Sequence, residues 1–516
     1  MSPSARGALR ASIVPALLTL VVYLVPVGGA EIAGNPNELV RILMTEAMLV
    51  DGTLALDGPI TAYGTSQDQS ERGGRTYSDK APGVSLLGLP VAWLAKAILP
   101  LEEGTPYPRY WPLRHVLVAL VVAIPTVLGM FALLMPSAPG IPNRARAWLA
   151  ALLCAATPML TYATTLFSHV PAALLCAAAW ALAIRGVPSA GRAGLAGLLA
   201  GFAVSTEYPT ILVGTVLMAA VAVRRPIRLA PVALFAIGMG AGLAPALLYH
   251  QEAFGSPFST GYAFKVDPGH SRVIATGASG VAFPAWERFV GVTGSARRGL
   301  FFYAPVLLLA VPGILARMRR APREALSIAG ACGVYLLFGA SFVDWEGGWC
   351  AAARHLVPIV PLLCVAVMWA MEAGSSSRLL VGSFAALAGV SAAHQALTVM
   401  LTPLYPEIFD APLAQVTARS LLEGAAMPNA ISWLGGAPAM GVALAWGALV
   451  LALVVIAAGR QPARASIVAA AAFVAALGLQ GWWSTRITAE QERGRAIVLD
   501  RLGYHELARA IVSRRP

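Results

Sequence analysis

The chain alternates between long runs of apolar residues and short polar stretches rich in arginine, and this pattern predicts its architecture. A helix needs about 20 apolar residues to cross the hydrocarbon core of a bilayer, and many of the runs approach that length. Unbroken helices are expected there, because no water in the core can satisfy a free backbone group. We therefore predict an all-α polytopic membrane protein with about thirteen transmembrane helices. The predicted spans are residues 11–30, 113–135, 147–167, 170–185, 193–206, 209–223, 229–249, 300–316, 325–343, 355–372, 379–401, 437–458 and 466–484.

The arginines set the orientation of these spans, since cytoplasmic loops carry an excess of Lys and Arg. With the N-terminus in the cytoplasm, the inner loops hold 16 of the 37 basic residues and two of the 25 acids, Glu324 and Glu372. A crossing by the apolar segment 83–100 would invert every later loop. We therefore expect this segment to lie flat on the outer surface as an interfacial helix, with Lys96 extending its ammonium group to water.

The first span, residues 11–30, has a second interpretation. A basic start, an apolar run and the small residues at 28–30 also fit a cleaved signal peptide. Cleavage would leave the topology of the remaining spans unchanged, so both interpretations lead to the same arrangement of loops.

Composition agrees with a membrane protein. Hydrophobic residues make up 58% of the chain and charged residues 12%. The net charge of +12 is concentrated in the predicted inner loops, so it does not require a nucleic-acid partner, and we expect none. The cysteines lie mostly inside apolar runs without ligand-like spacing, which favours packing roles. They are Cys154, Cys176, Cys332, Cys350 and Cys364.

Four stretches outside the predicted spans are long enough to form structure of their own: 31–112, 250–299, 402–436 and the tail from 485. We expect the first to lie across the mouth of the helical bundle. The predicted organisation is a membrane module with its outer loop, further membrane helices with two outer loops, and a short outer C-terminal tail, at residues 1–250, 251–484 and 485–516 respectively.

The first outer loop opens with a helical pattern of apolar residues. Leu39, Ile42 and Leu43 recur at helical spacing beside Arg41. This predicts an amphipathic helix on the membrane surface. The pair Asp51-Gly52 is expected to break it.

Three short elements of this loop resemble a known family. They are Asn37-Glu38 just after the first span, Met48-Leu49 followed by Gly52, and Asp79-Lys80-Ala81-Pro82 before the interfacial helix. In this order they resemble the GT-C glycosyltransferases. The branch most like them holds the protein O-mannosyltransferases and the lipid A aminoarabinose transferase. Later segments look like bacterial members of the same broad family, at residues 254–262, 298–309 and 345–358.

The resemblance implies a GT-C-like bundle and a glycosyltransferase activity. Such enzymes take a sugar from a polyprenyl-phosphate-linked donor, so a hexosyl or pentosyl group is expected to pass to a lipid, glycan or protein acceptor. It also implies a bacterial inner or plasma membrane, with the active site and the C-terminus on the extracytoplasmic side. The sugar, the acceptor and the oligomeric state are left open.

Glycosyl transfer needs a base, because the acceptor hydroxyl or amine loses a proton as it attacks the anomeric carbon. Glu38 is the candidate general base. The resemblance places the usual family Asp at Asn37, so the base is expected to have moved by one residue or to come from elsewhere. The alternative is that Glu38 only caps the surface helix.

Lys80 is the candidate ligand of the donor phosphate. It is one of three lysines beside 34 arginines, and an ammonium on a flexible stem suits a mobile phosphate. Asp79 is expected to hold that ammonium, Tyr77 to support it, and Pro82 to fix the entry to the interfacial helix. The alternative is a surface Asp-Lys pair of little energetic value.

Three further residues are candidates for the site. His169 lies in the second outer loop, where the resemblance implies an acidic residue, and is expected to orient substrate or relay a proton. A histidine satisfied by the backbone is the alternative. Arg354 and His355 begin a span at the outer face and are expected to bind a second phosphate oxygen, although interfacial anchoring also fits Arg354 with its tryptophan neighbours.

A transporter or lipid flippase is the alternative function. It should show repeated spans or ionisable residues near the midplane. His394 is the main ionisable candidate inside a span, and the acids instead cluster outside the spans. A divalent metal is left open, because acids are plentiful in the first loop but their spacing specifies no ligand set.

Overall fold

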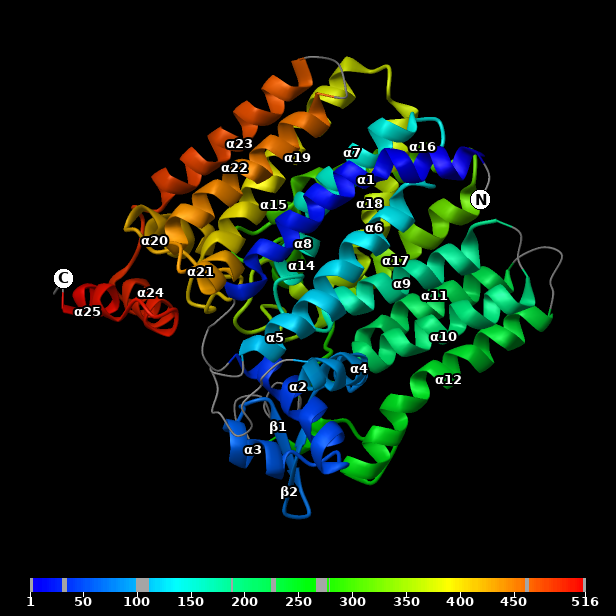
Figure 1. The fold of residues 1–516 in the computed structure, drawn as a ribbon. Coiled ribbons are helices and arrows are strands. Elements are labelled where there is room, and N and C mark those ends of the chain that lie inside the picture. The colour runs from blue at the N-terminus through cyan, green and yellow to red at the C-terminus, as the bar shows by residue number, and fades with distance from the viewer. Residues whose placement is uncertain are drawn as a thin grey trace.

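The computed structural model describes residues 3–29, 35–98, 111–186, 189–223, 229–265, 276–277, 279–459 and 464–513. Helices make up nearly all of its regular structure. Figure 1 shows a bundle of long helices with the elements of the first loop gathered at one end. These are α2 (Pro36–Glu46), α3 (Asp57–Tyr63), β1 (Gln69–Arg72), β2 (Arg75–Ser78) and α4 (Gly83–Ile98). Parts of two predicted outer loops, 99–110 and 266–275, lie outside the described residues.

Eight helices of the described chain are long and apolar enough to cross a membrane, which confirms the polytopic all-α architecture. They are Arg6–Val27 with α1 (Pro3–Leu24), Pro112–Leu134 from α5 (Trp111–Leu117) to α6 (Ile124–Leu134), α12 (Leu229–Phe254), α17 (Pro322–Ser341), Arg354–Ala373 with α18 (Val360–Ala373), α19 (Arg378–Leu401), α22 (Ala439–Ala458) and α23 (Arg464–Trp483).

The other five predicted spans fall on shorter helices, so the number thirteen stays a prediction. These helices are α7 (Asn143–Ala155) with α8 (Pro158–Tyr162), α9 (His169–Ile184), α10 (Ala190–Thr206), α11 (Ile211–Ala222) and α16 (Ala310–Met318). The remaining helices are short or lie near the C-terminus: α14 (Trp286–Thr293), α15 (Leu300–Tyr303), α20 (Arg419–Leu422), α21 (Ala430–Gly435), α24 (Ala489–Arg501) and α25 (His505–Ser513).

Helix α2 forms where the apolar pattern predicts it. Asn35 caps it through a hydrogen bond from the Asn37 N–H to the side chain of Asn35 (3.1 Å). A π-helical turn extends it to Asp51, and Gly52 ends that turn with φ +62°. However, every residue from Asn37 to Glu46 is buried, so α2 is enclosed and does not expose a polar face.

Helix α4 explains part of this burial, because it packs on α2. Lys96 does not extend to water as expected. Its Nζ lies 2.5 Å from Oε2 of Glu46, whose side chain is 1% exposed. Helix α4 is therefore tied to α2 by an ion pair near the C-terminal end of each helix.

Helices α10 and α12 lie in close contact because glycines face the partner backbone. A Cβ on Gly197 would come 2.0 Å from the carbonyl oxygen of Phe235, and one on Gly201 would come 2.0 Å from that of Met239. Such small residues allow helices in a membrane to approach closely. This packing fixes the C-terminal ends of both helices beside the first loop.

Candidate active site

Three segments distant in sequence meet at the end of the bundle that carries the first loop. A Cβ on Gly83 would lie 2.7 Å from the carbonyl oxygen of Ser205, and one on Gly261 would lie 2.6 Å from the Cα of Asp79. The start of α4, the end of α10 and the segment after α12 are therefore in direct backbone contact. Side chains from all three reach one charged cluster.

A β-hairpin places the element Asp79-Lys80 in this cluster. β1 and β2 are antiparallel, with Arg72 opposite Arg75, and Gly73 and Gly74 both have positive φ, at 60° and 74°. Two successive positive φ angles are typical of the tight turn that joins hairpin strands. The Gly-Gly pair was the available signal for this hairpin, which the sequence analysis missed.

Two lysines and two aspartates form a closed ring of ion pairs, which we call the lysine ring. The Lys80 Nζ lies 3.1 Å from Asp68 Oδ2 and 3.1 Å from Asp79 Oδ2. The Lys265 Nζ lies 3.1 Å from Asp68 Oδ1 and 2.9 Å from Asp79 Oδ2. The Lys80 and Asp79 side chains are 9% and 0% exposed. The alternative of a surface Asp-Lys pair is therefore wrong, because the pair is buried.

The lysine ring keeps the Asp68 carboxylate charged. Burial alone would raise the pKa of Asp68, but Lys80 and Lys265 outweigh burial and hold that pKa well below its usual value. Tyr262 lies over the same site, with the Lys80 Nζ 5.4 Å from the centre of its ring. Lys265 and Asp68 were not predicted, although Lys265 is one of only three lysines in the chain.

A second hydrogen-bonded group adjoins the predicted Asn37. Arg41 donates to both the carbonyl and the side-chain oxygen of Asn37, and its Nη2 donates to Ser168 Oγ at 2.9 Å. Ser168 in turn donates to Glu207. The His169 Nδ1 lies 3.2 Å from Glu207 Oε2. We call these five residues the Glu207 group.

Glu207 is an acid that the sequence analysis missed. It follows the last residue of α10, and its side chain is 16% exposed. Burial would raise the pKa of Glu207, but His169 and the hydrogen bond from Ser168 outweigh burial and lower it. The carboxylate is therefore ionised at neutral pH. Its position as a lone acid between two apolar runs is the sequence feature that could have identified it.

Glu38 faces a different partner. Its carboxylate receives two hydrogen bonds from Arg114, at 2.8 and 2.9 Å, and one from the backbone N–H of Leu166 at 2.7 Å. The Glu38 and Arg114 side chains are 0% and 1% exposed. Arg114 also donates to two backbone carbonyls, those of Val27 and Thr164. Glu38 therefore joins α2 to α5, and its role as a base stays a prediction.

The other predicted residues divide between the cluster and its surroundings. The His355 ring lies 5.7 Å from that of His169 in an edge-to-face arrangement. The Arg354 guanidinium lies 5.8 Å from the ring centre of Phe167 and interacts electrostatically with Asp68. Tyr77 instead packs edge-to-face on Phe254 at 5.9 Å. The structure thus brings His169, Arg354 and His355 toward the charged cluster, whereas the Tyr77 ring packs on Phe254.

The candidate metal ligands of the cluster are its carboxylates. Within the described ranges, there is no group of three or more His, Cys, Asp or Glu side chains that could hold one. The carboxylates of Asp68 and Asp79 already face the two lysine ammonium groups. Metal dependence stays open as a prediction.

Comparison with known proteins concerns the fold. No protein-family profile and no curated protein matches the sequence. Among solved structures, the chain is similar to ArnT from Cupriavidus metallidurans bound to undecaprenyl phosphate, with a TM-score of 0.52, 17% identity, and coverage of 96% of this chain and 77% of that chain.

Two other structures are matched less well. The apo oligosaccharyltransferase of Archaeoglobus fulgidus has a TM-score of 0.41 at 12% identity, covering 90% of this chain and 56% of its own. The arabinosyltransferase EmbB of Mycobacterium smegmatis has a TM-score of 0.44 at 13% identity, covering 99% and 43%. The similarity to ArnT shows that the chain has the GT-C fold that its three motifs predicted.

Proposed function

We propose that this protein is a membrane glycosyltransferase that moves a sugar from a polyprenyl-phosphate-linked donor to an acceptor on the extracytoplasmic face. The lysine ring carries this proposal. It places two ammonium groups, Lys80 and Lys265, in a nearly buried site at the end of an apolar helical bundle. A donor with an apolar chain and a phosphate needs such an arrangement, because the chain requires lipid and the phosphate requires cations.

The ring offers a route for phosphate to replace a carboxylate. Asp79 is fully buried, whereas the Asp68 side chain is 16% exposed. Asp68 is therefore the carboxylate with room to turn away, which frees donors on both lysines for phosphate oxygens. Arg354, which interacts with Asp68, would stabilise the charge that develops on the leaving phosphate.

The reaction forms one bond and breaks another at the anomeric carbon. The acceptor oxygen or nitrogen attacks that carbon, the bond from the carbon to the phosphate oxygen breaks, and the lipid phosphate leaves with the electron pair. The proton of the acceptor passes to a carboxylate. Glu38 is the base predicted from the sequence, and the Glu207 group adds a second candidate.

Two observations favour Glu207 for this role. Its side chain is partly exposed, whereas that of Glu38 is fully buried. Glu38 is also held by three hydrogen bonds from Arg114 and Leu166, which fix its carboxylate between α2 and α5 and leave it out of reach of an acceptor. Glu207 lies beside His169, which is placed to orient the Glu207 carboxylate or to accept a proton from it.

The test is a transfer assay with the purified protein in sealed vesicles. Undecaprenyl phosphate carrying a radiolabelled sugar is supplied as donor, and a cell-envelope extract is supplied as acceptor. The proposal expects the label to move from the lipid to the extract. Label that crosses the bilayer while still attached to its lipid would instead identify a flippase. Label that neither crosses nor leaves its lipid, with protein that is shown to be folded, would contradict both functions.

A further inference from the structure

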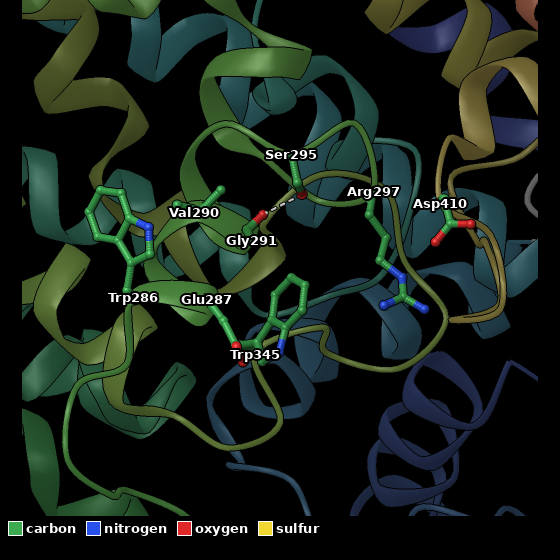
Figure 2. A pocket seen from close by; sticks show the side chains of 8 residues that line it. All are labelled: Trp286, Glu287, Val290, Gly291, Ser295, Arg297, Trp345 and Asp410. Carbon is green, nitrogen blue, oxygen red and sulfur yellow. Dashed lines mark hydrogen bonds between the residues drawn. The ribbon is translucent and has the colours of Figure 1, made fainter.

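A second site lies in the later loops, away from the lysine ring. It is an open surface cavity of about 470 Å³, comparable in volume to small-molecule sites. Figure 2 shows Glu287 between the indole rings of Trp286 and Trp345, with Arg297 and Asp410 on the other side of the cavity. We call it the indole cavity and define it by Trp286, Glu287, Gly291, Arg297, Trp345 and Asp410.

Both indoles are held in place by their neighbours. Trp286 is 75% exposed, but its ring stacks on Phe289 at 5.5 Å with an interplanar angle of 24°. Trp345 packs directly on the backbone of α14, since a Cβ on Gly291 would lie 2.4 Å from the Trp345 ring. The cavity therefore presents two supported aromatic surfaces without a ligand having to order them.

Backbone hydrogen bonds fix the wall that carries Trp286. The N–H groups of Ala282 and Ala285 donate to the carbonyls of Ser341 and Ala340, both at 2.9 Å. These bonds attach the start of α14 to the C-terminal end of α17.

The charge balance of the cavity differs from that of the lysine ring, where two lysines and two aspartates cancel. Arg297 forms an ion pair with Glu346 and donates to the carbonyl of Glu407, so its charge is balanced. Glu287 and Asp410 add two exposed carboxylates. The surplus is negative, which disfavours a phosphate-bearing donor here.

We infer that the indole cavity binds sugar rings of a neutral glycan acceptor. A pyranose ring has faces of C–H groups that pack on an indole, and a rim of hydroxyl groups that donate to carboxylates and accept from a guanidinium. The cavity supplies these partners together, as Trp286 and Trp345, Glu287 and Asp410, and Arg297.

Chain connectivity links this cavity to the reacting site. The loop that carries Trp345 continues to Arg354 and His355, which adjoin Phe167 and His169. A glycan held at the indoles would therefore contact the same loop that leads to the elements proposed to hold the donor phosphate. This inference rests on the proposed glycosyl transfer for its meaning, but binding of sugar can be measured without turnover.

The experiment uses the full chain in nanodiscs of phosphatidylcholine, free of glycoside detergents. Maltotriose, mannotriose and triacetylchitotriose are titrated separately, and binding is followed by saturation-transfer NMR on the sugar C–H protons. We expect at least one of these neutral trisaccharides to bind, and trigalacturonic acid, which is anionic, to bind more weakly. Trp286→Ala and Trp345→Ala should each weaken binding by about threefold to tenfold.

Trp482→Ala is the matched control. Trp482 is 60% exposed at the end of another long helix, and its removal should leave sugar binding unchanged. The inference is overturned when none of the three trisaccharides binds, or when the two cavity variants bind like the wild type. The contribution of Trp286 to fluorescence is the difference in emission between wild type and Trp286→Phe. Strong quenching of that contribution by brominated phospholipid would also overturn the inference, because Trp286 would then be a bilayer anchor.

Binding of undecaprenyl phosphate is measured in the same nanodiscs to separate the two claims. Loss of sugar binding with intact lipid binding in the Trp variants supports two sites. Sugar binding without any lipid binding in the wild type would contradict the proposed donor site and leave the indole cavity as a sugar site.

Discussion

The lysine ring and the indole cavity differ in almost every physical property. The ring is buried, and its two ammonium groups alternate with two carboxylates. The cavity is lined by indoles and has exposed carboxylates. The lysine ring therefore holds charged groups in a poorly solvated place, where electrostatic interactions are strong. The indole cavity offers apolar surface with hydrogen-bonding groups.

Under the proposed function, this difference would let one protein separate a phosphate-linked donor from a neutral glycan acceptor. A phosphate-linked donor is favoured where cations are available, and it is disfavoured where Glu287 and Asp410 leave negative charge. A neutral glycan gains little from buried lysines but gains from indole surfaces. Variants that change one site should therefore leave binding at the other unchanged.

The largest effect is expected from the proposed base, Glu207. Glu207→Gln keeps the shape and hydrogen bonding of the side chain but removes its basicity. Turnover should fall on the order of 100-fold or more, with donor and trisaccharide binding close to wild type. Steady-state transfer rates measure this, and turnover that survives the change would remove Glu207 from the reaction.

Glu38→Gln distinguishes the two carboxylates. It leaves Arg114 buried beside a neutral side chain, so we expect the free energy of unfolding to fall by roughly 3 kcal/mol, seen as a lower Tm. Turnover per folded molecule should change little. A normal Tm with turnover reduced as much as in Glu207→Gln would instead establish Glu38 as the base predicted from the sequence.

Variants of the lysine ring should lose binding of charged lipids but keep binding of neutral lipids. Lys265→Ala and Lys80→Ala should each weaken binding of a polyprenyl-phosphate sugar by about tenfold to 100-fold, and Lys80→Arg should restore only part of it because the guanidinium fork has a different geometry. Binding of a neutral polyprenol and of trisaccharide should be unaffected. Equal losses for charged and neutral lipids would point to misfolding of the loop.

A smaller effect should follow when Trp345 is displaced without being removed. Gly291→Ala places a methyl group against the Trp345 ring, where a Cβ would come within 2.4 Å. Trisaccharide affinity should fall about twofold to tenfold, and donor affinity should not change. Gly294→Ala is the control in the same segment, because a Cβ there meets nothing within 4 Å. An equal loss in both variants would contradict a specific role for Trp345.

The smallest effect concerns pH. Because the folded state lowers the pKa of Asp68, its contribution to stability is present above its unfolded pKa and is lost as pH falls through the lower folded value. The stability difference between wild type and Asp68→Asn should be flat from about pH 8 to pH 5 and shrink below about pH 4. Thermal melts across pH test this, and a loss already near neutral pH would mean that the lysines do not hold Asp68 charged.

Sequence reasoning identified the parts of the site that depend on local pattern. The all-α membrane class follows from run length, and Asp79-Lys80 does pair as expected. His169 and His355 also approach each other, as their predicted positions at the same side of the membrane allow. These features need only spacing, charge and the position of a residue relative to a span.

The partners from distant segments could not be predicted in this way. Lys265 and Glu207 reach the cluster because α10 and α12 pack through glycines and because Gly261 lies against Asp79. Arg114 occupies Glu38 from another helix, which no periodicity within the first loop reveals. Tertiary contact therefore decided which acid is exposed and which is buried.

The most direct test of the account is the lipid that purifies with the protein. Wild type, Lys80→Ala and Lys96→Ala are prepared in parallel, and their extracts are analysed by mass spectrometry. Lys96 is the matched control, because it also pairs with a buried carboxylate but does so with Glu46, near the C-terminal end of α4. We expect polyprenyl phosphate, free or carrying a sugar, to purify with wild type and Lys96→Ala but not with Lys80→Ala. Equal amounts in all three proteins, or only bulk phospholipid in each, would contradict the lysine ring as the donor site.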